Sequence, residues 1–409
     1  MNEATRLFIQ QHRQEDVRQL ALRGAKDPEV DLPSALQQID GYQRALEKLP
    51  SWAAIEGILW PAHLSMEQCS SEQTARYKAE VAGKGDVFVD LTAGFGVDAA
   101  FIAKGFQRAV CVERQSELCA ISSANYRLLG LQQTEVVNGN GIDYLHAMVP
   151  ADLIFIDPAR RDEHGGRTYG IADCSPNVLE VMDELRMKAR RVMIKLSPML
   201  DWRKAVEDIG REYVSAVHIV SVANECKELL VEVKGRKGEQ GKKETGEEVM
   251  TMKVVCVNLL ADGSTEHFEF DAYSHLPTPS PLHLSTSSPF HLLYSPNASV
   301  MKAGCFDLLA ERFGLRQADR NSHLFLSDKE IDGFPGRGFV VERVCSMNKR
   351  DLKEGLAGLT QANMAVRNFP LSVAELRKRL KLKDGGDTYI FATTLANMGH
   401  RLLICRKIS

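Results

Sequence analysis

The 409-residue chain is longer than one hydrophobic core usually serves, which predicts two or three domains. Its 44% apolar and 26% charged residues are ordinary for a globular protein. No apolar run reaches the roughly 18 residues of a membrane span, and the N-terminus lacks a signal-peptide pattern. Nine cysteines without a C-x-x-C pair argue against a disulfide framework or a structural zinc site. We therefore expect a cytoplasmic protein that binds neither a membrane nor a metal; the oligomeric state stays open.

The net charge of −3 conceals an uneven distribution along the chain. From Arg343 to the end there are 13 Lys/Arg against 5 Asp/Glu, a balance of +8, so the remainder sums to −11. A basic terminal module on an acidic body favours an anionic partner such as nucleic acid. A solvated helix face would give the same balance.

Residues 1–80 are predicted to be helical, because apolar residues recur at spacings of three and four. Ser70-Ser71-Glu72 is typical of a capped helix start. We expect this region to act as a buttress or lid and to carry no chemistry.

From residue 81 to about 233, short apolar strands alternate with helices, which indicates an α/β fold. Strands are expected at residues 86–91, 109–113, 134–138, 153–156, 191–196, 216–222 and 228–234. Helices are expected at residues 98–104 and 116–129, with a short one after Asp143. Because the last two strands lie close together, we expect five parallel strands closed by a hairpin, a doubly wound sheet of seven strands.

The charge- and glycine-rich residues 234–253 predict an exposed hairpin tip or a disordered insertion. A β-hairpin is expected over residues 254–270, and the Pro- and Ser-rich residues 275–296 predict a linker or wrapping loop. Two small α/β pieces follow, the first with a helix over residues 298–313 and the second with a helix over residues 373–381. The expected domains are residues 1–80, 81–275, 276–343 and 344–409.

A glycine loop, D-L-T-A-G-F-G-V-D at residues 90–98, stands where the first strand turns into the first helix. Glycines let the backbone approach a ligand, and a helix N-terminus offers unpaired N–H groups. With Ala99 in the third position, a dinucleotide-binding dehydrogenase stays formally open. Asp90 argues against it, because a carboxylate there repels a pyrophosphate and suits a ligand with ammonium and sulfonium cations.

Glu113 closes the second strand, where such folds place the acid that accepts hydrogen bonds from ribose hydroxyls. Asn140 or Asp143 follows the third strand, where a polar side chain can contact an adenine. Together these motifs resemble the class I S-adenosylmethionine-dependent methyltransferases over residues 81–233, which implies a Rossmann-like sheet and S-adenosylmethionine as cofactor. The resemblance implies that the cofactor is held by Asp90, Thr92, Ala93, Gly94, Gly96, Asp98, Glu113, Asn140 and Asp143. Asn140 departs from the aspartate usual in the family, so the adenine contact could shift to Asp143.

The loop after the fourth strand reads Asp157-Pro158-Ala159-Arg160-Arg161. Relatives that methylate base nitrogens often carry Asp/Asn-Pro-Pro-aromatic there, where the acid draws off developing positive charge. The catalytic residues implied are Asp157, Pro158 and Arg160. The chain keeps Asp-Pro but replaces Pro-aromatic with Ala-Arg.

Three interpretations of the arginines stay open. Arg160 stacks on a flipped base, or Arg160 and Arg161 grip a phosphate, or an Arg–Asp pair only shapes the loop. Tyr169 is an alternative stacking platform. Lys195, after the fifth strand, meets either a substrate phosphate or a core acid.

The last segment, from Arg367 to Arg406, is similar to the THUMP-like domain of certain bacterial methyltransferases, and residues 296–343 resemble the small ferredoxin-like domain of the same family. This resemblance implies structured RNA, tRNA or rRNA, as a partner. The expected contacts on the helix over 373–381 are Arg377, Lys378, Arg379 and Lys381. The resulting hypothesis is a methyltransferase acting on an RNA base. The alternatives are an RNA-binding protein with a degenerate cofactor pocket and a methyltransferase of a small molecule or protein.

Overall fold

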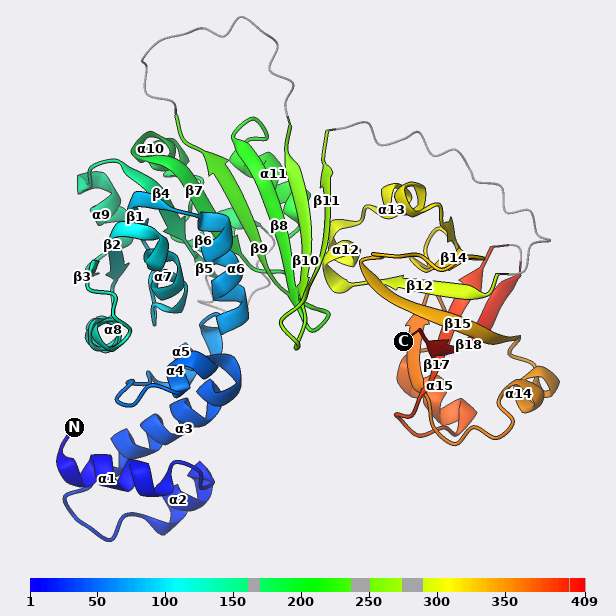
Figure 1. Cartoon of the computed structure of the whole chain (residues 1–409), viewed down its shortest axis with the longest axis horizontal. Coiled ribbons are helices and arrows are strands. Elements are labelled where there is room, and N and C mark those ends of the chain that lie inside the picture. The colour runs from blue at the N-terminus through cyan, green and yellow to red at the C-terminus, as the bar shows by residue number, and fades with distance from the viewer. Residues whose placement is uncertain (161–169, 237–250, 274–289, 397, 409) are drawn as a thin grey trace, which may run out of the picture. The chain divides into compact units, whose positions relative to one another are not determined.

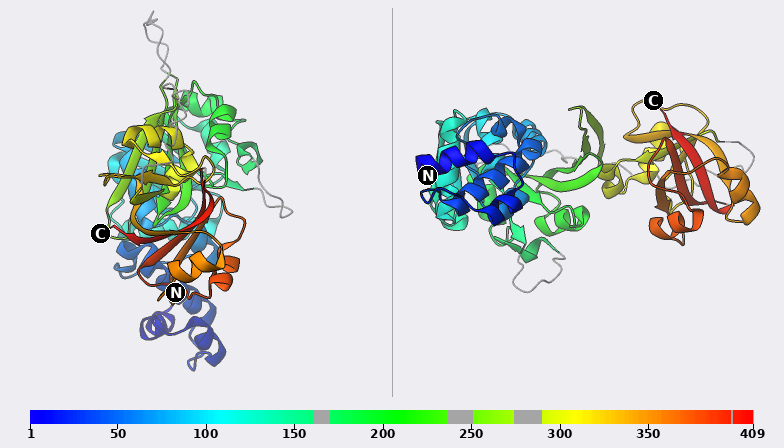
Figure 2. Two further views of the ribbon diagram at one scale, coloured as in Figure 1. Left: turned by 90° about the vertical axis from the view of Figure 1, so that its right-hand side faces the viewer. Right: turned by 90° about the horizontal axis from the view of Figure 1, so that it is seen from below.

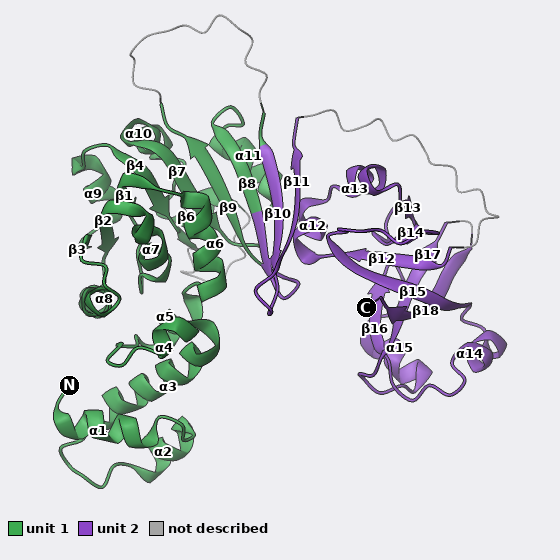
Figure 3. Cartoon of the chain, in the orientation of Figure 1, with its two compact units in different colours: residues 1–218, 227–252 green, residues 219–226, 253–409 purple. Residues whose placement is uncertain are grey.

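The computed structural model describes residues 1–160, 170–236, 251–273, 290–396 and 398–408 (Figure 1). The chain forms two compact units, residues 1–218 with 227–252 and residues 219–226 with 253–409 (Figure 3). The domain boundaries expected from the sequence stay predictions. Within the described ranges, no helix is both long enough and apolar enough to cross a membrane.

Six helices precede the first strand (Figure 2). They are α1 (Glu3–His12), α2 (Val17–Arg23), α3 (Leu32–Lys48), α4 (Pro50–Ala53), α5 (His63–Gln68) and α6 (Glu72–Ala82). Side-chain oxygens of Asn2, Asp16, Asp31 and Ser71 accept backbone N–H groups and begin four of them. Trp52 and Trp60 pack with Phe95, and helices α3 to α6 contribute side chains to one core with the sheet.

The larger sheet has nine strands in the order β11-β10-β8-β9-β7-β4-β1-β2-β3. The strands are β1 (Gly85–Asp90), β2 (Phe106–Glu113), β3 (Thr134–Asn138), β4 (Ala151–Ile156), β7 (Ala189–Leu196), β8 (Val214–Val222), β9 (Glu225–Lys234), β10 (Lys253–Leu259) and β11 (Thr265–Asp271). Strands β1, β2, β3, β4 and β7 are parallel, and β9 runs antiparallel to β7. The seven strands expected between residues 81 and 233 are confirmed, and the β10–β11 hairpin extends the sheet to nine.

Helices connect the parallel strands of this sheet. They are α7 (Val97–Ile102), the 3-10 turn η1 (Ala103–Gly105), α8 (Ser116–Leu128), α9 (Gly141–Ala147), α10 (Met182–Lys188) and α11 (Trp202–Ile209). A short β5 (Ala159–Arg160) pairs with β6 (Cys174–Ser175), just after η2 (Ile171–Asp173). Because carboxyl ends of parallel strands meet at one edge, the loops after β1, β2, β3, β4 and β7 gather there. We call this the carboxyl edge.

The second sheet has seven strands in the order β13-β14-β12-β15-β18-β17-β16. They are β12 (Leu292–Pro296), β13 (Arg316–Gln317), β14 (Phe325–Ser327), β15 (Gly336–Cys345), β16 (Asn363–Arg367), β17 (Thr388–Leu395) and β18 (Gly399–Lys407). Helices α14 (Lys349–Gly355) and α15 (Val373–Leu380) pack on one face of it through Leu352, Leu376 and Ile390 (Figure 2). Segments 276–343 and 344–409, expected as separate domains, contribute strands to this one sheet.

Two sequence predictions are corrected by the structure, and one strand was missed. The helix expected over 298–313 is two helices, α12 (Ala298–Ala303) and α13 (Phe306–Phe313), because Gly304 takes a left-handed conformation (φ +66°) that ends the first. The linker expected over 275–296 ends in strand β12, which pairs with β14 and β15. Strand β16 was not predicted, because it is a short edge strand without a clear alternation of exposed and buried residues.

Candidate active site

The glycine loop connects β1 to α7 and lies at the carboxyl edge. Asp90 is buried, and its Oδ1 accepts from the Thr92 backbone N–H at 2.9 Å. Gly94 and Gly96 both have positive φ, +55° and +81°. At Gly96 a Cβ would lie 2.1 Å from Tyr126 Oη, whereas at Gly94 no atom lies within 4 Å of that position. Gly96 is therefore needed for packing, and Gly94 leaves open space beside the loop.

Glu113 ends β2 and holds the glycine loop. Its Oε2 accepts from the Gly94 backbone N–H at 3.0 Å, and its Oε1 accepts from the Gln115 backbone N–H at 2.8 Å. The Ala93 backbone N–H donates to the Val112 carbonyl, also at 3.0 Å. The structure thus brings Glu113 and the loop glycines together.

Asn140 and Asp143 lie beyond β3, at the beginning of α9. Asn140 is the N-cap of that helix and accepts from the Ile142 N–H at 2.8 Å, and Asp143 stands in its first turn. Both side chains are exposed. A Cβ at the intervening Gly141 would lie 2.0 Å from the Leu91 carbonyl oxygen, so α9 begins directly against the glycine loop.

The Asp157-Pro158 turn after β4 is fixed to the same loop. The Asp157 backbone N–H donates to Thr92 Oγ1 at 2.7 Å, and the Asp157 side chain is 36% exposed while Pro158 is buried. Asp157 Oδ2 accepts from the Lys195 ammonium at 2.6 Å. The turn is thus held at its backbone by Thr92 of the glycine loop and at its carboxylate by Lys195 of β7.

Lys195 belongs to a lysine–carboxylate network that the sequence did not reveal. Lys78, in α6, is fully buried and lies 2.6 and 2.7 Å from the two carboxylate oxygens of Glu228 in β9. It also lies 3.2 Å from Asp98 Oδ1, and Lys195 lies 3.8 Å from Asp98 Oδ2. Asp98 further accepts from the Ser70 hydroxyl at 2.8 Å. The expectation that residues 1–80 carry no chemistry stays a prediction, but α6 contributes Lys78 to this buried ion-pair network.

The pKa shifts follow from burial and from these pairs. Burial raises the pKa of Asp90 well above its usual value, and the neighbouring charges of Asp98 and Asp157 add to the rise. Burial also acts on Asp98, but the ammonium groups of Lys78 and Lys195 outweigh it and hold that pKa below its usual value. Burial opposes the charge of Lys195, yet Asp157, Asp98 and Glu228 together raise its pKa. Lys195 is therefore a fixed cation and Asp98 a fixed anion.

The remaining predicted site residues follow β4 in the sequence or lie in and just after α15. Arg161 and Tyr169 lie outside the described residues; the backbone of Arg160 is in β5. Arg377 in α15 donates to Asp384 Oδ1 at 2.6 Å. Lys378, Arg379 and Lys381 are exposed. The role of all these residues in contacting a substrate stays a prediction.

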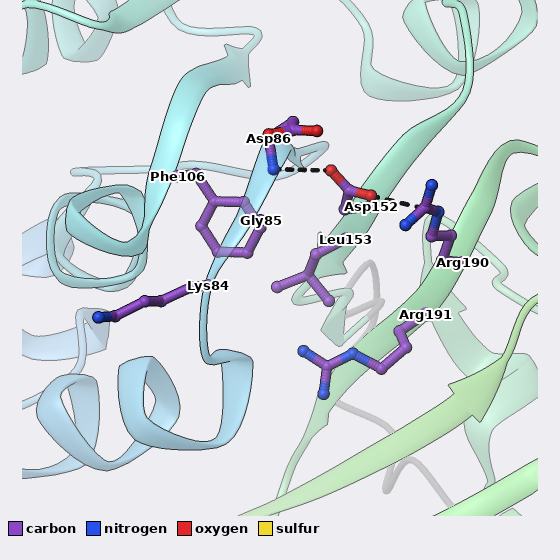
Figure 4. Close-up of a pocket in the computed structure, with 8 residues that line it drawn as sticks. All are labelled: Lys84, Gly85, Asp86, Phe106, Asp152, Leu153, Arg190 and Arg191. Atoms are coloured by element: carbon purple, nitrogen blue, oxygen red, sulfur yellow. Dashed lines mark hydrogen bonds and ion pairs between the residues drawn. The ribbon is translucent and has the colours of Figure 1, made fainter.

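A cavity of about 320 Å³ opens at the opposite, amino end of the strands (Figure 4). Lys84, Asp86, Asp152, Arg190 and Arg191 line it, among others. Asp152 pairs with Arg190 at 3.3 Å, and Arg191 pairs with Glu232 at 3.1 Å. Because Asp152, Arg190 and Arg191 are already paired, we assign this cavity no ligand. No group of three or more His, Cys, Asp or Glu side chains in the described ranges is arranged to hold a metal ion.

Comparison with known proteins places the chain in a family. A family model for a THUMP domain-like module matches residues 336–407, and one for a ferredoxin-like domain matches residues 292–335. The crystal structure described as "putative methyltransferase from Porphyromonas gingivalis W83" is 31% identical over 99% of this chain and 98% of that chain, with a TM-score of 0.82. The chain belongs to the class I methyltransferase family with a C-terminal THUMP-like domain.

More distant solved structures resemble part of this methyltransferase-family chain. An rRNA methylase from Streptococcus thermophilus is 17% identical and covers 40% of this chain and 96% of that one, with a TM-score of 0.30. The M. capricolum TrmK structure, in complex with S-adenosyl-homocysteine, is 13% identical and covers 42% and 71%, with a TM-score of 0.32. No curated protein matches the chain.

Sequence reasoning missed Lys78 and Glu228. They are 150 residues apart, and neither stands in a motif. The one signal for Lys78 is its place in α6, where it follows Ala75 and precedes Ala82, both fully buried. A lysine on an apolar helix face indicates a buried charge that needs an acid.

Proposed function

We propose that this protein transfers a methyl group from S-adenosylmethionine to a base in structured RNA, tRNA or rRNA. The observation that carries the proposal is the position of Asp157: its backbone N–H donates to Thr92 of the glycine loop at 2.7 Å. The loop after β4, where the resemblance implies an acceptor site, is thereby tied to the loop where the resemblance implies a cofactor.

The residues present suit this cofactor. Open space at Gly94 lets a ligand approach the backbone closely, and buried Asp90 offers a carboxyl group to a cationic ligand. Asp90, Thr92, Ala93, Gly94, Gly96 and Asp98 would surround its methionine end, Glu113 its ribose, and Asn140 or Asp143 its adenine. When bound, S-adenosylmethionine supplies an electrophilic methyl group on a sulfonium centre.

In this proposal Asp157 receives the acceptor amine. Its Oδ2 is taken by Lys195, which leaves Oδ1 to accept a hydrogen bond from an exocyclic N–H of the base. As the nitrogen gains positive charge in the transition state, this carboxylate stabilises it and orients the lone pair. Pro158 stiffens the turn, and Lys195 acts as a positioning residue that fixes the carboxylate. Arg160 would stack on the base or grip an adjacent phosphate.

The test is methyl transfer from isotopically labelled S-adenosylmethionine to RNA prepared from cells that lack the protein. We expect the wild-type protein to label this RNA and Asp157→Ala to lower the rate about 100-fold or more. Mass spectrometry of the digested nucleosides would identify the base and the methylated atom. Asp86→Ala, an exposed acid at the opposite end of β1, is the matched control and should keep the wild-type rate. Equal labelling by Asp157→Ala and wild type would refute the assignment of Asp157.

A further inference from the structure

Two arginines lie on the same face of the seven-stranded sheet. Along β17, Phe391 and Thr393 alternate with Ile390 and Ala392, which pack under α14 and α15. Arg367 in β16 is opposite Thr393, so its side chain is on the face away from those helices. Arg337, in β15, extends over the ring of Phe339, with 5.9 Å from its Cζ to the ring centroid.

Aromatic rings form the floor between these arginines. The Phe339 ring lies 4.8 Å from the Phe391 ring and 5.0 Å from the Tyr389 ring. Phe339 and Phe391 are buried, whereas Tyr389 is partly exposed. Of the three aromatic residues, Tyr389 is the one that keeps some exposure to solvent.

The charges on this face lack acidic partners. Among the described residues, no carboxylate forms an ion pair with Arg337 or Arg367, and Arg367 makes one long hydrogen bond, 3.4 Å to the Val366 carbonyl. Arg367 is half-buried. Burial, followed by the charge of Arg337, lowers the pKa of Arg367. An unpaired, half-buried cation is unfavourable unless an anion or water compensates it.

A histidine adds a donor or acceptor next to Arg367. Thr393, opposite Arg367, donates from Oγ1 to Ser322 Oγ at 2.9 Å, which holds His323 nearby. The His323 ring stacks on Phe306 at 3.9 Å, and its Nδ1 is buried with no partner in the described part of the chain. Burial and then Arg367 lower the pKa of His323. The acid of this segment, Asp319, already accepts from Asn321 and Asn368.

We propose that this cationic face, formed by Arg337 and Arg367 with the uncharged His323 ring beside Arg367, binds the phosphate backbone of a single-stranded or loop segment of RNA. The planar guanidinium groups suit phosphate oxygens, and Tyr389 offers a ring on which a base can stack. The inference rests on the proposed RNA substrate and assigns its contact to this sheet face, in addition to the exposed helix α15. It joins both family segments, because His323 lies in the ferredoxin-like match and both arginines lie in the THUMP-like match.

The test measures RNA affinity and thermal stability for Arg367→Met and Arg337→Met in the full-length protein. The probe is tRNA and rRNA from cells lacking the protein, in filter binding between about 50 and 200 mM salt. We expect each variant to weaken binding about 5- to 20-fold and to reduce the salt slope by about one. Arg367→Met should keep or raise the melting temperature, because it removes an unpaired cation. Arg350→Met is the control, since Arg350 is exposed and paired with Glu354, and it should bind as wild type.

Each outcome separates this inference from the proposed function. If the wild-type protein methylates RNA, and Arg337→Met and Arg367→Met bind RNA as tightly as wild type, the cationic face is not an RNA contact. The proposed activity then stands. Wild type that binds RNA through these arginines but transfers no methyl group supports the face and refutes the proposed activity. Wild type that binds neither RNA pool overturns both. Displacement of RNA by poly-L-glutamate at equal charge concentration would overturn RNA as the occupant.

Discussion

The carboxyl edge of the nine-stranded sheet buries its charges, whereas on the cationic face of the seven-stranded sheet Arg367 is half-buried and Arg337 is exposed, and the two sites differ in how their charges are compensated. At the carboxyl edge every buried lysine has a carboxylate within 4 Å, as Lys78 has Glu228 and Lys195 has Asp157. On the cationic face, Arg337 and Arg367 have no such partner among the described residues. A paired site holds its own side chains in place, whereas an unpaired one gains free energy when an anion arrives. The comparison therefore predicts opposite responses when one charge is removed.

Lys78→Met should have the largest effect on stability. It leaves Glu228 and Asp98 buried without their cation, which lowers the free energy of unfolding by about 3–5 kcal/mol. Denaturant unfolding checks this, with Lys84→Met as the control because Lys84 is exposed. If Lys78→Met is as stable as Lys84→Met, the network does not hold the edge together.

Alanine at the two loop glycines should separate ligand binding from folding. Gly94→Ala places a methyl group in the open space, so we expect S-adenosylmethionine affinity to fall about 10-fold with a stability loss near 1 kcal/mol from the positive φ. Gly96→Ala meets Tyr126 Oη and should lose more stability than Gly94→Ala. Calorimetric titration and thermal melting of both variants make the comparison. The same affinity for Gly94→Ala and wild type would place the cofactor elsewhere.

The buried Asp90 carboxyl predicts that stability depends on pH and that cofactor binding releases a proton. Burial raises its pKa in the folded protein above the unfolded value, so the folded state binds the extra proton. The stability that this protonated carboxyl contributes is present at low pH and is lost as pH rises through the raised pKa. A bound cation favours the ionised form, so cofactor binding should release up to about one proton, and Asp90→Asn should abolish that release. Calorimetry in two buffers of different ionisation enthalpy measures it; a buffer-independent enthalpy in wild type would show that Asp90 does not ionise.

The exposed cations of α15 should give the smallest effect. Lys378→Ala and Arg379→Ala each remove one solvated charge, so we expect RNA affinity to fall only about 2- to 3-fold at low salt and less at high salt. Filter binding of these variants and of Arg367→Met shows whether α15 or the cationic face contributes more to RNA affinity. A larger loss from Lys378→Ala than from Arg367→Met would make α15 the main RNA contact.

Local motifs made much of the carboxyl edge predictable. The D-L-T-A-G-F-G loop and Glu113 follow strand ends, and the alternation of strands and helices fixed their common edge. Lys78 and Glu228 were out of reach, because their pairing depends on how α6 packs against β9. The cationic face was equally hidden, since it depends on β16, an edge strand without a clear pattern, pairing in register with β17. Arg367 therefore looked like an ordinary residue of a basic tail.

Titration of S-adenosylmethionine into wild type and Glu113→Ala tests directly whether the carboxyl edge binds the cofactor. We expect one binding site per chain in wild type and at least a 10-fold weaker affinity in Glu113→Ala, which loses the charged hydrogen-bond partner that we propose for the ribose. Glu135→Ala, an exposed acid in β3 paired with Arg108, should bind as wild type. No binding to wild type, or equal binding to Glu113→Ala, would contradict a cofactor site at the carboxyl edge.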